Sequence, residues 1–182
     1  MRTASATHRT IETVWRIESA RLIAGLARVV RDVGLAEELA QDALSTEALG
    51  GEHGPYALQA AIAACHARAR TPEDTDWTRI AVLYEVLSQV APSPVVELNR
   101  AVAFSMAFGP AMGLELVDAL TPLPSLAHYH LLPSVRADLL AKLGRFEEAG
   151  AEFERAASLT RNARERELLL ERAVECVSHR GD

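Results

Sequence analysis

The sequence predicts an all-α protein, and three observations support that prediction. Ala, Leu, Glu and Arg are prominent among its 182 residues while runs of β-branched residues are scarce, a mixture that helices favour. Apolar residues recur at spacings of three and four along most of the chain. Short breaks rich in Gly and Pro separate these periodic stretches.

The first predicted elements are two helices within residues 1–46. A single apolar stripe at helical spacing runs through Ile11, Trp15, Leu22, Leu26, Val29 and Val33. Gly34 provides a stop signal after this helix. The second helix has a packing side made of Leu35, Leu39, Ala40 and Ala43. Its other side carries four polar groups one turn apart, Glu37, Glu38, Gln41 and Asp42.

The loop that follows marks a domain boundary. Residues 45–55 read STEALGGEHGP, and the glycines clustered there are strong loop signals. We therefore expect residues 1–46 to form one part of the chain, residues 47–54 a linker, and residues 55–182 a second domain.

The second domain is predicted to alternate helices and turns. A helix is expected over 56–69, and the next one begins where Thr71 can cap it and Pro72 can occupy its first position. Breaks at APSP, GP and TPLPS separate the helices that follow. These are expected over 95–108, 111–120, 126–143, 146–159 and 163–177, with Pro133 kinking or interrupting the start of the third.

Helix pairs at this spacing are typical of a solenoid. The clearest unit is LGRFEEAGAEFERAASL, in which Ala149, Phe153 and Ala156 share one helix face. It resembles the second half of a tetratricopeptide (TPR) repeat, where small residues permit close helix approach and the aromatic fills the gap. The turn glycines Gly109 and Gly144 are 35 residues apart, close to the period of that repeat. The resemblance implies a right-handed array of antiparallel helix pairs.

The formal net charge of −6 is unevenly distributed. Residues 1–34 hold six arginines against three acids, which leaves thirteen basic and twenty-two acidic residues in the remainder. An acidic body repels phosphate, so general nucleic-acid binding is not expected there. No segment reaches the roughly 18 apolar residues of a membrane helix, and the first residues do not resemble a signal peptide. We therefore expect a cytoplasmic protein with no membrane contact.

Two parts of the chain resemble a known family. Residues 14–44, VWRIESARLIAGLARVVRDVGLAEELAQDAL, resemble the beginning of the second region of extracytoplasmic-function (ECF) sigma factors. Within them, AEELAQDAL is similar to the segment that grips the RNA polymerase clamp. The later stretches GPYALQAAIAACHARA, APSPVVELNRAVA and HYHLLPSVRADLLAKLGRFEEA resemble the carboxy-terminal TPR-like extension of one ECF subgroup. The resemblance implies a transcription regulator that works through protein contacts, with core RNA polymerase or a regulatory protein as partner.

The chain departs from that family between the two parts. ECF sigma factors carry there the helices that melt and read the −10 element and a helix-turn-helix that reads the −35 element, and neither pattern is found here. Sequence-specific DNA binding is therefore not expected, and the joint near Ser45 resembles an internal deletion or fusion. Because the apolar stripe of the amino-terminal helices lacks its usual cover, we expect those helices to dock on the array or to form a homodimer.

Two sets of candidate contact residues follow. The resemblance implies that Glu37, Glu38, Gln41 and Asp42 contact the polymerase clamp, and the alternative is a solvated helix face. A concave groove that takes a peptide or a carboxylate is the second candidate site, and its residues are Asn99, Arg100 and Arg136. The alternative for these three is that they face solvent or cap neighbouring turns.

No enzyme activity, metal site or cofactor is expected. His128 and His130 point about 200° apart on a helix, and Cys65 and Cys176 lack metal-type spacing. No phosphate-binding glycine loop or pattern of a catalytic triad stands out. The alternative function is a free-standing TPR adaptor or scaffold with no role at the polymerase.

Overall fold

The computed structural model describes residues 54–178, so the predicted helices within 1–46 and nearly all of the 47–54 linker lie outside it. Within the described residues the chain forms seven α-helices, two short 3-10 helices and no strand, which confirms the all-α prediction. None of the helices in this range is both long and apolar enough to cross a membrane. The chain divides into two compact units, Met1–Val90 and Ala91–Asp182.

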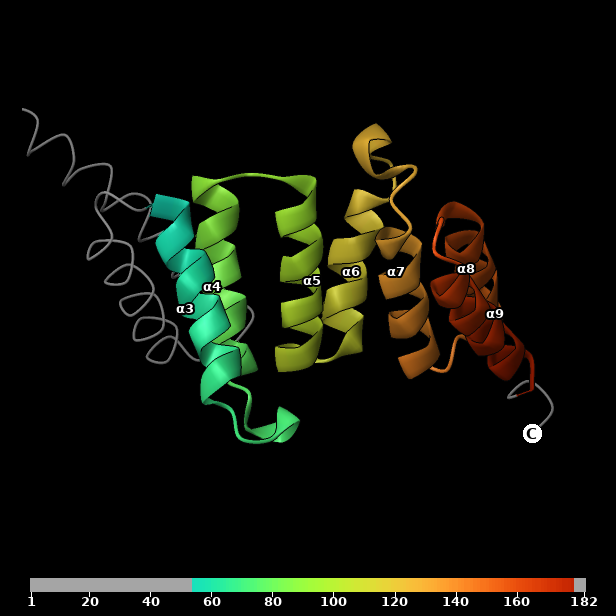
Figure 1. Cartoon of the computed structure of the whole chain (residues 1–182), viewed down its shortest axis with the longest axis horizontal. Coiled ribbons are helices and arrows are strands. Elements are labelled where there is room, and N and C mark those ends of the chain that lie inside the picture. Colours follow the sequence, from blue (N-terminus) through green and yellow to red (C-terminus); the bar gives the residue numbers. More distant parts are fainter. Residues whose placement is uncertain (1–53, 179–182) are drawn as a thin grey trace, which may run out of the picture. The chain divides into compact units, whose positions relative to one another are not determined.

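The described helices of the first unit are α3 (Gly54–Arg68) and α4 (Trp77–Val90), which pack against each other in opposite directions (Figure 1). On α3 the buried apolar residues recur every three or four positions and lie on one face, whereas on α4 consecutive positions are buried as well, so its buried residues occupy more than one face. These residues include Leu58, Ile62 and Cys65 on α3 and Ile80, Leu83 and Leu87 on α4. The helix predicted over 56–69 is thus confirmed, with small changes at its ends.

The start of α4 differs from the prediction. Thr71 makes no side-chain capping hydrogen bond, and Pro72 opens a separate 3-10 helix that ends at Asp74. The backbone at Thr75 is extended, so this turn does not continue into α4. Asp76 caps α4 instead, because its Oδ1 accepts a hydrogen bond from the backbone N–H of Arg79 at 2.9 Å.

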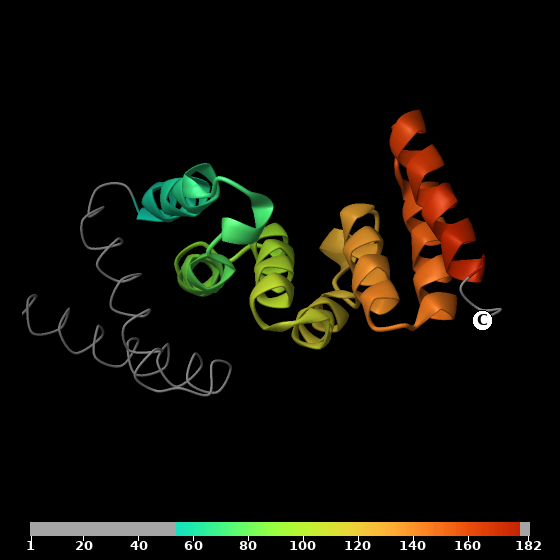
Figure 2. The ribbon, with the colours of Figure 1, turned by 90° about the horizontal axis from the view of Figure 1, so that it is seen from below.

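Residues 91–178 of the second unit contain five α-helices: α5 (Pro94–Phe108), α6 (Pro110–Leu120), α7 (Leu131–Lys142), α8 (Phe146–Leu159) and α9 (Ala163–Ser178). Each helix packs on the next, and successive helices alternate in direction (Figure 1). Figure 2 shows α8 and α9 lying side by side. The helix ends have local causes, since Ser93 caps α5 and Gly109, with a φ of 100°, separates α5 from α6.

The helix predicted over 126–143 is shorter than expected. Leu126 closes a separate 3-10 helix (Pro124–Leu126), and α7 begins only at Leu131. Pro133 is therefore the third residue of α7, and the helix continues unbroken past it. N–H groups in the first turn of a helix have no intrahelical acceptor, so a proline at this position removes no backbone hydrogen bond.

The TPR-like motif that the sequence analysis identified, LGRFEEAGAEFERAASL, contributes to the core of the second unit. Phe153 is 1% exposed, and Ala149 and Ala156, one turn before and after it, are fully buried. The guanidinium of Arg172 on α9 lies 4.5 Å from the centroid of the Phe153 ring, a cation–π geometry. The side chains predicted to pack in this unit are therefore in the core.

The helices α5 and α6 approach closely at Gly113. A methyl group on this glycine would lie 2.4 Å from Cβ of Ser105 and 2.9 Å from the carbonyl oxygen of Ala101. Because neither atom belongs to the mobile end of a long side chain, the packing of α6 on α5 requires a residue without a side chain here.

Candidate protein-contact site

A groove opens between α5 and α7 in the second unit, and its volume is about 220 Å³. One face of each helix contributes to it. The lining residues are Val102, Ser105 and Met106 on α5 and Ser134, Val135, Asp138, Leu139 and Lys142 on α7. We refer to this feature as the α5/α7 groove.

The α5/α7 groove offers mainly apolar contacts, although two serines line it. Ser105 donates its hydroxyl hydrogen to the carbonyl of Val102 at 2.7 Å, and Ser134 donates to the carbonyl of His130 at 2.8 Å. Both hydroxyl hydrogens are thus engaged within their own helices. Met106 is 47% exposed, so a large and adaptable apolar side chain is available at the surface.

Two lining residues of α7, Asp138 and Lys142, form a cluster of three charges with Arg172 of α9, which is not itself part of the lining. The carboxylate of Asp138 lies 2.7 Å from Nζ of Lys142 and accepts a hydrogen bond from Arg172 at 2.9 Å. Burial alone would raise the pKa of Asp138, but the hydrogen bonds and charges of its two basic partners outweigh burial and lower that pKa. Two cations share one carboxylate, so the cluster keeps one net positive charge beside the groove.

Two of the three predicted groove residues lie on α5. Asn99 is exposed and stands one turn before Val102 on the same helical face. Arg100 pairs with Glu97 on its own helix, and its guanidinium lies 5.3 Å from the centroid of the Phe104 ring. Neither Asn99 nor Arg100 is among the residues that line the α5/α7 groove.

The third predicted groove residue, Arg136, ties three helices together. Its Nε donates to Asp118 of α6 at 2.8 Å, and its Nη1 donates to Glu152 of α8 at 3.0 Å. On α7 its position is about 200° around the helix from Asp138, which lines the groove. The structure therefore gives the Arg136 charge a role in joining helices.

The predicted polymerase-contact residues Glu37, Glu38, Gln41 and Asp42 lie outside the described residues. Their assignment stays a prediction, and so does the expected homodimer through the amino-terminal helices.

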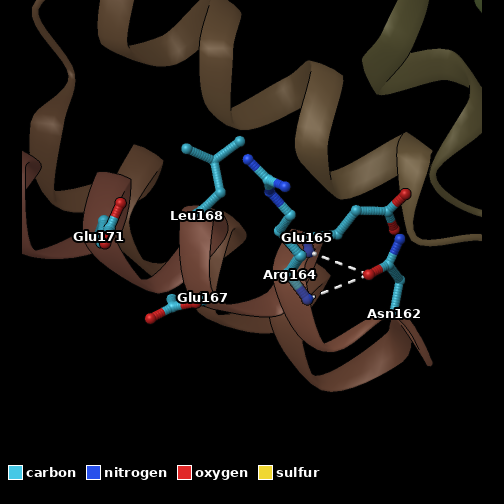
Figure 3. Close-up of a pocket in the computed structure, with 6 residues that line it drawn as sticks. All are labelled: Asn162, Arg164, Glu165, Glu167, Leu168 and Glu171. Carbon is cyan, nitrogen blue, oxygen red and sulfur yellow. Dashed lines mark hydrogen bonds between the residues drawn. The ribbon is translucent and has the colours of Figure 1, made fainter.

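A second hollow lies along the start of α9 (Figure 3), lined by Asn162, Arg164, Glu165, Glu167, Leu168 and Glu171. Two of its polar side chains, Asn162 and Glu165, make local contacts at the helix start. Oδ1 of Asn162 accepts hydrogen bonds from the backbone N–H groups of Arg164 and Glu165 at 3.0 and 3.4 Å. Glu165 accepts the hydroxyl hydrogen of Thr160 at 2.7 Å and lies 3.4 Å from Nε2 of His130. We interpret this hollow as the surface of a capped helix start.

The described residues contain no group of three or more His, Cys, Asp or Glu side chains placed to hold a metal ion. Cys65 and Cys176 are free and buried, and burial raises the pKa of both thiols. Thiols with a raised pKa are protonated near neutral pH and react slowly.

A groove with Asn99 and Arg100 on one helix and Arg136 on another was predicted from the sequence, but the residues that line the α5/α7 groove were not. Asn99, Val102 and Met106 follow one another at spacings of three and four, which places them on one face of α5. That spacing does not give the residues of α7 that form the other wall, because α6 separates the two helices in sequence.

No protein family matches the chain, and no solved structure matches it. The chain is similar to an uncharacterized protein of Rhizobium meliloti (strain 1021), with 50% identity over 112 residues. The matched stretch makes up 62% of this chain and 26% of that protein, so the chain spans about a quarter of the relative's length.

Proposed function

We propose that the chain is a transcription regulator related to ECF sigma factors, and that its helical array is a TPR-like protein-contact module. The observation that carries the contact role is the α5/α7 groove, because apolar grooves between helices commonly take a segment of a partner protein. The transcription role is supported by the resemblance of residues 14–44 to the second region of ECF sigma factors.

Several features of the second unit support a TPR-like arrangement. Gly109 and Gly144 adopt positive φ values of 100° and 74° in the turns before α6 and α8. Gly113 on α6 and the adjacent Ala149 and Gly150 on α8 are buried. Small buried residues of this kind are typical of positions where two helices approach closely. An array of this kind is a rigid scaffold, which suits a docking surface.

The proposed partner of the amino-terminal residues is core RNA polymerase. Glu37, Glu38, Gln41 and Asp42 would contact the clamp, as their resemblance to the sigma segment implies. Promoter reading is not part of this proposal, because the sequence lacks the segments that read the −10 and −35 elements. We also propose a cytoplasmic location and no catalytic activity.

A transcription competition assay tests this function. The chain is added to core RNA polymerase together with a complete ECF sigma factor and a promoter that this factor recognises. We expect excess chain to reduce the sigma-directed transcript and to produce no promoter-specific transcript alone. The matched variant Glu38→Ala/Gln41→Ala/Asp42→Ala should not inhibit. An unchanged transcript at excess chain, or equal inhibition by the variant, would contradict a polymerase contact and favour a free-standing adaptor.

A further inference from the structure

We infer that the α5/α7 groove binds a partner protein segment in which a large apolar side chain lies close to a carboxylate. This inference rests on the proposed function in one respect, because it takes the groove to be the protein-contact surface. It goes beyond that function by naming the chemistry of the partner. Two independent features of the groove lead to it, one apolar and one electrostatic.

The apolar feature is the size and lining of the groove. Its volume of about 220 Å³ exceeds that of an engineered protein cavity of about 150 Å³ that holds a benzene ring. Val102, Met106 and Val135 line this space, so an aromatic or large aliphatic side chain finds apolar partners on both walls. Met106 is 47% exposed and unbranched, which lets it close over side chains of different shapes.

The electrostatic feature is the surplus positive charge on the α7 side. Lys142 and Arg172 are 48% and 40% exposed, and both use the single carboxylate of Asp138. The Lys142 ammonium has three N–H donors, of which Asp138 takes one. A carboxylate on the incoming segment would supply the second anion that these two cations lack. A basic segment would meet like charge at the same place.

The order of groups along α7 determines where the carboxylate should lie. Lys142 and Val135 both line the groove and are separated by two helical turns, with Asp138 between them. A partner side chain that packs on Val135 and a partner carboxylate that binds Lys142 should therefore be separated by about one to two helical turns along the partner segment.

Selection from a display library of short random peptides on the full-length chain tests the inference. We expect the enriched peptides to combine an aromatic or large aliphatic residue with Asp or Glu and to be poor in Lys and Arg. Fluorescence anisotropy with the best labelled peptide then gives its affinity for the parent chain and for variants.

Two variants and one control locate the binding. Met106→Glu places a charge on the apolar wall, and we expect affinity to fall more than about tenfold. Lys142→Glu reverses the charge at the edge and should weaken an acidic peptide about tenfold, while selection on this variant should enrich basic peptides instead. Val174→Glu is the matched control, because Val174 is 70% exposed on α9 and outside the groove lining. This control should bind as the parent does.

The groove substitutions are tolerable for the fold because Met106 and Lys142 are both about half exposed, and far-UV circular dichroism checks each variant. The inference is overturned if selection yields no peptides, if the selected peptides are basic, or if they bind Met106→Glu and Lys142→Glu as tightly as the parent. Transcription competition is scored separately. If the groove binds acidic peptides but the chain does not inhibit transcription, this inference stands and the polymerase role is contradicted. If the chain inhibits transcription but the groove binds no acidic peptide, the polymerase role stands and this inference is overturned.

Discussion

The close approach of α5 and α6 predicts that Gly113→Ala destabilises the protein. The added Cβ would lie 2.4 Å from Cβ of Ser105 and 2.9 Å from the carbonyl oxygen of Ala101. A Cβ atom is fixed to its backbone, and the Ala101 carbonyl belongs to the backbone of α5, so rotating a side chain relieves neither contact. The two helices must separate to admit the methyl group.

The size of this effect follows from two opposing terms. Overpacking a well-filled contact costs about 1–3 kcal/mol. Alanine also has a higher helix propensity than glycine, which returns about 1 kcal/mol. Because both contacts are shorter than ordinary Cβ contacts, we take the upper part of the overpacking range, about 2–3 kcal/mol, which leaves a net destabilisation of about 1–2 kcal/mol.

Gly150→Ala provides a matched control in the same unit. Gly150 is also a buried helical glycine, but the atoms nearest to its added Cβ, the Ala173 carbonyl oxygen and Cys176 Cβ, lie at 3.7 Å, an ordinary contact distance. This variant should be as stable as the parent or more stable by up to about 1 kcal/mol. Equilibrium urea unfolding followed by far-UV circular dichroism measures both variants. A Gly113→Ala variant as stable as Gly150→Ala would show that the close contact at Gly113 does not limit the packing of α6 on α5.

Three further predictions concern charge, capping and burial. Because the pKa of Asp138 is lowered in the folded state, its carboxylate stabilises the fold above the unfolded value of about 3.9 and loses this effect as pH falls through the folded pKa. The difference in the free energy of unfolding between the parent and Asp138→Asn, measured by urea unfolding, should therefore be constant near neutral pH and shrink below about pH 4. A difference that does not change with pH would contradict this prediction. Asp76→Ala should cost about 1 kcal/mol while Thr71→Ala should be nearly neutral, and equal losses would mean that Asp76 is not the cap. Iodoacetamide should label Cys65 and Cys176 slowly until denaturant is added, so rapid labelling of the native protein would contradict their burial.

Helix existence could be predicted from the sequence wherever local signals agree. The helix expected over 95–108 is found at Pro94–Phe108, because Ser93 with Pro94 and then Gly109 with Pro110 punctuate both of its ends. The start of α4 could not be placed in this way. Thr71 and Asp76 are both capping residue types, and only the extended backbone at Thr75 decides between them.

The start of α7 could not be placed for a related reason. The residues after Pro124 have the composition of a helix, but the chain makes a 3-10 helix that ends at Leu126 before α7 begins at Leu131. The effect of Pro133 depends on its distance from the helix start, which the sequence does not give. Because α7 begins at Leu131, this proline falls in the first turn, where it is tolerated.

The candidate site was less predictable than the fold, because its charges find partners on other helices. Arg136 bonds to Asp118, which is 18 residues away, and Arg172 bonds to Asp138, which is 34 residues away. Periodicity gives the face of a helix on which a residue lies, but it does not give the helix that this face meets. Asn99 shares the α5 face of Val102 and Met106, and Arg136, also predicted to line a groove, bonds to Asp118 of α6 and Glu152 of α8.

Direct titration of core RNA polymerase is the decisive test of whether this chain is a sigma-factor relative that acts through protein contacts. The labelled chain is titrated with core polymerase and fluorescence anisotropy is recorded, with the Glu38→Ala/Gln41→Ala/Asp42→Ala variant as the matched control. We predict saturable binding by the parent chain and loss of binding in the variant. No saturable binding by the parent, or identical curves for the two proteins, would contradict the proposed polymerase contact.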